Sequence, residues 1–184
     1  MNQLTIVILV VVVSVVIVLL AFAFSRKRRR EKLRQRFGPE YDRVLEQEKD
    51  VRKAEGVLEF RARQREQFKI HPLSTEAKSS FAGRWGEVQA RFVDDPRGAV
   101  TLADHLITDV IQARGYPIGE FQQQVADLSV DYPVIVDNYR AAHEIAERHR
   151  AGQANTEDLR QAMVHYRALF QELIEERHME KKGA

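Results

Sequence analysis

The segment from Leu4 to Phe24 contains no charged residue in 21 positions, and its only hydroxyl side chains are those of Thr5 and Ser14. A helix rises about 1.5 Å per residue, so this segment is about 30 Å long, which matches the hydrocarbon core of a bilayer. A lone segment in lipid must pair its own backbone groups, and only a helix does so. The segment therefore predicts a transmembrane anchor over residues 1–25.

An export signal is the alternative interpretation, because Ala21, Phe22 and Ala23 have the A-x-A pattern that precedes signal cleavage. However, the first three residues include no Lys or Arg, and the apolar segment is longer than that of a typical signal. Residues 26–36 then carry eight basic side chains and one acidic side chain. Because positive flanks stay in the cytoplasm, we expect an uncleaved anchor with its N-terminus outside and its C-terminal domain cytoplasmic.

The net charge of the whole chain hides a difference between the basic juxtamembrane segment, residues 26–37, and the acidic remainder. The net charge is +2, but the chain from Phe37 onward has 21 basic and 26 acidic residues. This mildly acidic remainder argues against a nucleic-acid partner. The chain has no Cys, which excludes a disulfide framework and thiol chemistry. No glycine-rich phosphate-binding motif is present, so we expect no nucleotide and no small-molecule substrate.

Anionic lipid headgroups are the partners that the basic segment predicts. A base near an anionic membrane surface contributes about 1 kcal/mol to binding. The side chains expected at the headgroups are Arg26, Lys27, Arg28, Arg29, Arg30 and Lys32.

The remaining chain predicts helices only, and thus an all-α protein. Gly38 and Pro39 interrupt the chain after the basic segment, and a charged helix or stalk is expected over residues 38–70, running unbroken from Glu40 to about Phe68. A compact bundle is expected over residues 71–178, followed by a frayed tail at 179–184. Its five or so helices should begin near Ser74 or Thr75, Pro96, Gly119, Pro133 and Thr156, and end near Val93, Gly115, Leu128, Ala151 and Ile174.

Several words of this sequence resemble a known set of proteins. They are RFGPEYDR, RFVDDP, ADLSVDYP, NYRAAHEIA and EDLRQAMVHYRALF, which together fall within residues 37 to about 174, apart from the first letter of RFGPEYDR. The chain resembles an uncharacterised bacterial family of single-pass membrane proteins with a helical C-terminal domain. The resemblance implies a setting in the bacterial inner membrane, but it transfers no functional residue, because that family has no known activity.

His143 and Glu147 form the sharpest local candidate for chemistry, because residues four apart lie on one face of a helix. A zinc-protease helix needs H-E-x-x-H, however, and position 147 is Glu. A surface pair between histidine and carboxylate explains the spacing without a metal. We therefore expect no metal, no cofactor and no catalytic residue, and keep a metal-dependent enzyme using His143, Glu147 and His165 as an alternative.

The stretch SVDYPVIVDNYR combines polar and aromatic residues at a predicted helix start. Tyr and Arg are common in binding hot spots, although helix capping and packing explain the same residues. The expected function is a membrane-anchored, non-enzymatic helical module that binds a protein partner at the cytoplasmic face of the inner membrane. A structural accessory subunit of a membrane complex is a further alternative. The candidate partner-binding residues are Tyr132, Asp137, Asn138, Arg140 and His143.

Overall fold

The computed structural model describes the backbone of residues 3–175 and the side chains of residue 3 and residues 11–175. This part of the chain contains eight helices and no strand, which confirms the predicted all-α class. The chain divides into two compact units, one ending at Leu58 and the other beginning at Glu59. The helices are α1 (Gln3–Phe37), α2 (Pro39–Glu48), α3 (Val51–Arg65), α4 (Thr75–Arg91), α5 (Pro96–Ala113), α6 (Phe121–Asp131), α7 (Val136–Arg150) and α8 (Thr156–Glu175).

The anchor predicted for residues 1–25 is not supported by the described residues. Among them, no helix combines the length and the apolar character that crossing a membrane requires. The anchor stays a prediction from the sequence. The predicted tail at 179–184 lies outside the described residues.

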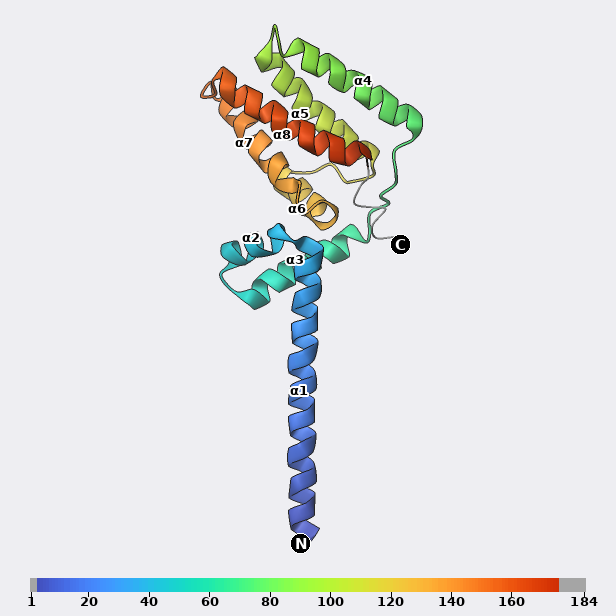
Figure 1. Ribbon diagram of the computed structural model, residues 1–184, viewed down its shortest axis with the longest axis vertical. Coiled ribbons are helices and arrows are strands. Elements are labelled where there is room, and N and C mark those ends of the chain that lie inside the picture. The colour runs from blue at the N-terminus through green and yellow to red at the C-terminus, as the bar shows by residue number, and fades with distance from the viewer. Residues whose placement is uncertain (1–2, 176–184) are drawn as a thin grey trace. The chain divides into compact units, whose positions relative to one another are not determined.

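The first unit contains α1, α2 and the first half of α3. Helix α1 is a single helix of 35 residues, which continues from the apolar segment through the basic one (Figure 1). It ends at Phe37, as predicted, because Gly38 adopts a φ of 48° and Pro39 begins α2. Apolar side chains of all three helices are buried in this unit: Leu33, Phe37, Tyr41, Val44, Ala54 and Leu58.

The prediction of one unbroken helix from Glu40 to Phe68 is wrong, because the chain turns at Lys49 and Asp50. Lys49 has a left-handed φ of 54° and ends α2. The carboxylate of Asp50 accepts hydrogen bonds from the backbone N–H groups of Arg52 and Lys53, at 2.8 and 3.0 Å. An aspartate that satisfies the free N–H groups of the next turn starts a new helix. The charged segment is therefore two helices, α2 and α3, joined by a short turn.

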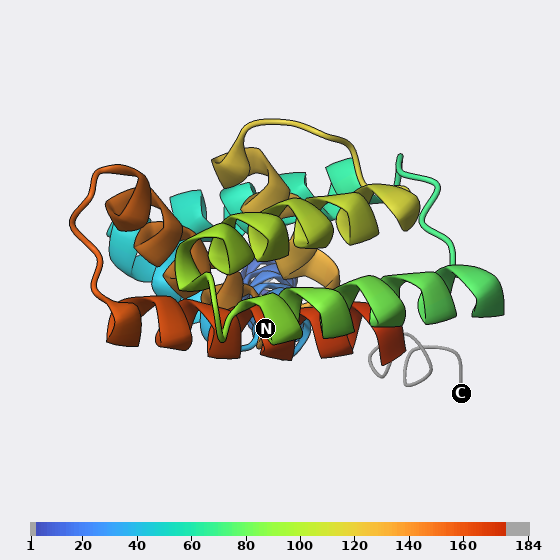
Figure 2. The same cartoon turned by 90° about the horizontal axis from the view of Figure 1, so that it is seen from above.

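The second unit contains the second half of α3 and, as predicted, a bundle of five helices, α4 to α8. Helix α8 packs along α5 and α7, and α4 lies along α5 (Figure 1, Figure 2). The ring of Trp85 on α4 stacks on that of Phe170 on α8, with centroids 4.8 Å apart. One continuous core of buried residues extends from Leu73 to Leu173 and joins these helices.

Side-chain caps explain where three of these helices begin. Ser74 accepts the N–H of Ala77 at 3.1 Å at the start of α4. Asp95 accepts the N–H of Gly98 at 2.9 Å and precedes Pro96, the first residue of α5. At the start of α8, Asn155 and Asp158 each accept the other's N–H, at 3.0 and 2.9 Å. This reciprocal arrangement is a capping box.

Helices α6 and α7 begin later than predicted. Helix α6 begins at Phe121 and extends to Asp131, where the sequence suggested an end at Leu128. Helix α7 begins at Val136 instead of at Pro133. The carbonyl of Tyr132 accepts the N–H groups of Ile135 and Val136 at 3.2 and 3.1 Å, so Pro133 lies in a turn between the two helices.

The second half of α3 belongs to the second unit and is hydrogen-bonded to α6. Arg65 donates to Asp131 at 2.5 Å, and Arg61 donates to the hydroxyl of Ser129 at 3.3 Å. The hydroxyl of Tyr116 also donates to Asp131, at 2.7 Å. Burial, together with the neighbouring Asp131 carboxylate, raises the pKa of Tyr116, so this hydroxyl stays a donor. Asp131 of α6 is thus hydrogen-bonded both to α3 and to the segment between α5 and α6.

Candidate functional site

The predicted partner-binding residues do not form one surface. The side chain of Tyr132 is only 1% exposed, so it packs inside the bundle and is removed from the candidate surface. The Oδ1 of Asn138 accepts a hydrogen bond from Nδ1 of His165 on α8, at 2.7 Å, so Asn138 links α7 to α8. His143 lies five residues further along α7, which places it on another side of this helix. Its contacts are with α5 and α6.

Asp137 and Arg140 form a pair on α7, but the side chain of Arg140 is only 16% exposed. Their side chains form an ion pair at 2.7 Å, three residues apart on one helical face. The side chain of Asp137 is half exposed. Val134, which the sequence analysis did not select, is 58% exposed in the turn before α7. Val134 and Asp137, three positions apart, are the two exposed residues of the stretch 131–140.

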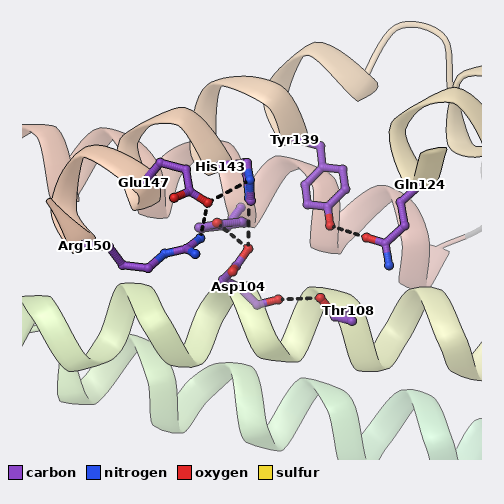
Figure 3. Close-up of polar contacts among 8 residues, drawn as sticks. Asp104, Thr108, Gln124, Tyr139, His143, Glu147 and Arg150 are labelled. Carbon is purple, nitrogen blue, oxygen red and sulfur yellow. Dashed lines mark hydrogen bonds and ion pairs between the residues drawn. The ribbon is translucent and has the colours of Figure 1, made fainter. Parts of the chain in front are cut away.

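His143 of α7 is the centre of a polar cluster that also involves α5 and α6 (Figure 3). Its Nε2 lies 3.2 Å from Oε1 of Glu147, and that same oxygen lies 2.6 Å from Arg150. Its imidazole ring stacks on the ring of Phe121 of α6, with centroids 3.6 Å apart and an interplanar angle of 10°. The buried Nδ1 faces Asp104 of α5 at 3.9 Å, which is too long for a hydrogen bond.

Asp104 is the residue of this cluster that the sequence analysis missed. Its Oδ1 accepts the hydroxyl of Tyr166 on α8 at 2.7 Å. Burial by itself raises the pKa of Asp104, but His143 and the Tyr166 hydroxyl outweigh burial and hold that pKa below its ordinary value. Burial and the Asp104 charge in turn raise the pKa of Tyr166. The cluster therefore holds an ionised carboxylate against a protonated phenol.

A signal for Asp104 does exist in the sequence. It lies four residues after Val100 and three before Ile107, and both of these are fully buried. A carboxylate at helical spacing on an apolar face needs a partner, because an unpaired buried charge is costly. The sequence could thus show that Asp104 is paired, but it could not show that the partners come from α7 and α8.

The contacts of the cluster explain its residues as structural links. His143 and Glu147 share a face, as their spacing predicted, and Arg150 also pairs with this glutamate. Among the described residues, no three His, Cys, Asp or Glu side chains are grouped closely enough to hold a metal ion. The alternative of a metal-dependent enzyme at His143, Glu147 and His165 therefore gains no support.

The six basic residues predicted to contact lipid all lie on α1 and are exposed. The guanidinium of Arg28 lies over the ring of Phe24 at 4.6 Å. Arg30 instead turns toward α2, where its Nε donates to the hydroxyl of Tyr41 at 3.2 Å. Arg52, at the start of α3, joins this basic surface from a distant part of the chain. The sequence analysis missed Arg52, because no local pattern relates it to α1.

Comparison of the chain with protein-family models, with curated proteins and with solved structures found no match. The residues and contacts above are therefore the basis for the function proposed below.

Proposed function

We propose that this chain is a membrane-anchored, non-enzymatic helical module that binds a protein partner at the cytoplasmic face of the bacterial inner membrane. The bacterial setting follows the resemblance of its sequence words. The anchor is the segment from Leu4 to Phe24, and the bundle of α4 to α8 is the partner-binding part. The exposed bases of α1 lie at the anionic headgroups.

The observation that carries this proposal is the continuity of α1. One helix of 35 residues joins the uncharged segment to the basic one without a turn. The side chains of Leu19, Leu20 and Phe22 are more than 60% exposed on it. Such exposure of large apolar side chains is costly in water and favourable in lipid. The change from apolar to basic along one helix supports a helix that leaves the membrane on its cytoplasmic side.

The bundle supports a binding role in place of an enzymatic one. Its best cluster of titratable residues is used in contacts between α5, α7 and α8. The ion pair of Asp137 and Arg140, of which the aspartate is half exposed, is the candidate contact for the partner, with exposed Val134 near it in sequence. Anchoring confines a weak binder to the membrane surface and raises its effective concentration near a membrane-bound partner.

Cysteine labelling of the membrane topology tests the proposal. The chain has no Cys, so a single Ser80→Cys variant carries one exposed thiol on α4. Intact cells are treated with a membrane-impermeant maleimide and compared with lysed cells. We expect Ser80→Cys to react only after lysis. Its matched control, Gln3→Cys, lies before the uncharged segment 4–24 and should react in intact cells.

The opposite pattern would contradict the proposed orientation. Reaction of Ser80→Cys in intact cells places the bundle outside the cytoplasm. Release of the protein from membranes by alkaline carbonate would show that residues 4–24 are not an anchor at all.

Alanine substitution tests the candidate partner surface. Asp137→Ala with Arg140→Ala should reduce the recovery of proteins that are chemically cross-linked to the bundle in cells. Arg167→Ala, an exposed substitution on α8, serves as the control and should leave recovery unchanged. Equal recovery from all variants would remove Asp137 and Arg140 from the proposal.

A further inference from the structure

A cleft within the first unit lies between α1 and the start of α3. It has a volume of about 450 Å³ and is lined by Phe22, Ser25, Arg26 and Arg29 of α1 and by Arg52 and Glu55 of α3. A second hollow of about 500 Å³ shares Phe22, Arg26 and Glu55 with it and adds Lys27 and Arg30. Both hollows lie where the uncharged segment of α1 gives way to the basic one.

The charge of this cleft is strongly positive. Five basic side chains line the two hollows against the single carboxylate of Glu55. Glu55 is only 6% exposed, and its Oε1 accepts the hydroxyl of Tyr41 at 3.3 Å. Tyr41 in turn accepts from Arg30. The acid is thereby held at the base of the cleft, while Arg26, Arg29 and Arg52 are exposed at its walls.

The cleft also has an apolar side. Phe22 is 67% exposed, and the exposed side chains of Val18 and Leu19, four and three residues before it, continue the same face along α1. A ligand that fits this arrangement has an anionic group at one end and an apolar chain at the other.

We propose that the cleft binds an anionic phospholipid, with Arg26, Arg29 and Arg52 donating hydrogen bonds to its phosphate and Phe22 packing beside its acyl chain. This proposal rests on the proposed function, because it needs α1 in the membrane. Arginine suits such a site, since its planar guanidinium donates two parallel hydrogen bonds to phosphate oxygens. The feature that separates the site from general attraction to the membrane surface is Arg52, which reaches the cleft from α3.

Native mass spectrometry of the full chain in detergent micelles tests the proposal. Phosphatidylglycerol and phosphatidylcholine of equal chain length are added in turn, and the fraction of protein that retains one lipid is measured. Arg52→Gln is compared with Lys53→Gln, which removes the same charge from the next residue of α3 and does not line the cleft. Arg52→Lys keeps the charge and tests the arginine geometry, and circular dichroism checks that every variant is folded.

We expect retention of phosphatidylglycerol but not of phosphatidylcholine, and an affinity about fivefold lower for Arg52→Gln, which is the effect of one base at a lipid headgroup. Lys53→Gln should bind within about twofold of the unchanged protein, and Arg52→Lys should fall between Arg52→Gln and the unchanged protein. Equal affinities of Arg52→Gln and Lys53→Gln would overturn the site. Equal retention of the two lipids would also overturn it.

Competition with soluble glycerol 3-phosphate tests whether the phosphate group bound in the cleft belongs to a lipid or to a soluble phosphoester. If it displaces phosphatidylglycerol at equal concentration, the ligand is a soluble phosphoester and the lipid assignment is wrong. The topology labelling uses neither Arg52 nor added lipid, so its result separates the two proposals. If Ser80→Cys reacts only after lysis while Arg52→Gln and Lys53→Gln bind lipid equally, the proposed anchor stands and the proposed lipid site in the cleft is wrong.

Discussion

Gly115 ends α5 in a backbone conformation that other residues rarely adopt. Its φ is 90°, and a Cβ atom placed there would lie 2.3 Å from the carbonyl oxygen of Lys69. Positive φ strains any residue with a Cβ, and here the clash is with backbone that cannot easily move. Gly115 is thus required by both conformation and space.

We expect Gly115→Ala to lower the free energy of unfolding of the bundle by about 3 kcal/mol or more. The matched control is Gly152→Ala, where φ is 72° but no atom lies within 4 Å of the added Cβ. This control should cost only about 1 kcal/mol, from backbone strain alone. Trp85 is the only tryptophan of the chain, so its fluorescence during urea unfolding measures both values. Equal losses would show that the Lys69 carbonyl moves aside.

Asp104 makes the stability of the bundle depend on pH. Its folded-state pKa lies below the ordinary value, so the ionised form stabilises the fold. This contribution is fully present above the unfolded pKa of about 4 and is lost as pH falls through the lower folded pKa. We expect Asp104→Asn to cost about 1 kcal/mol at pH 6 and to differ less from the unchanged protein at pH 2.5.

Urea unfolding at the two pH values measures this difference. Asp94→Asn, an exposed substitution in the turn between α4 and α5, is the control and should follow the unchanged protein at both values. A cost of Asp104→Asn that is the same at pH 2.5 as at pH 6 would contradict the role of the charge.

At the scale of elements, Asp50 decides that α2 and α3 are separate helices. Its carboxylate caps α3 by accepting the backbone N–H groups of Arg52 and Lys53. These two hydrogen bonds, the one from Lys53 most of all, lower the pKa of Asp50. The local preference of the surrounding residues is for one continuous helix. The break at Asp50 is favoured because it lets both helices bury apolar side chains. Helix α2 buries Tyr41 and Val44, and α3 buries Ala54 and Leu58.

We expect Asp50→Ala to loosen the first turn of α3. Without the capping acceptor, the amide hydrogens of Arg52 and Lys53 should exchange with solvent about fivefold faster. Asp50→Asn keeps an acceptor oxygen and should exchange nearly as slowly as the unchanged protein. Hydrogen exchange measured by NMR resolves these amides, and unchanged rates in Asp50→Ala would show that the turn does not depend on the cap.

At the scale of the molecule, the two units divide within α3, and the bundle has a core of its own. The continuous core of the bundle extends from Leu73 to Leu173 and includes no residue before Glu59. A core of this kind is what a domain needs to fold alone.

We expect the fragment 59–184 to fold without the rest of the chain. It should unfold cooperatively in urea, as followed by Trp85 fluorescence and by circular dichroism with one common midpoint. The arginines of α3 at positions 61 and 65 are retained in this fragment with their partners on α6. The shorter fragment 71–184 is the control, and it should be less stable because Asp131 loses Arg65. A fragment 59–184 without a cooperative transition would contradict the division into units.

The sequence by itself determined which segments are helices and where most of them begin. Ser74, Asp95 and the pair of Asn155 and Asp158 are local signals, because a cap needs only the next turn of the same chain. The apolar faces of α5 and α8 are likewise set by helical spacing. The uncharged segment and the basic residues after it also need no tertiary contact to be recognised.

Only the tertiary structure decided which side chains meet. Tyr132 reads as a surface residue in its polar sequence but is buried, and Asn138 and His143 lie on different sides of α7. Asp104 faces His143 and accepts from Tyr166, and Arg52 lines one cleft with Arg26 and Arg29, across gaps of more than 20 residues. Contacts of this kind depend on how helices pack, and packing is set by the sum of many side chains, whereas a cap or a helical face is set by its neighbours in sequence.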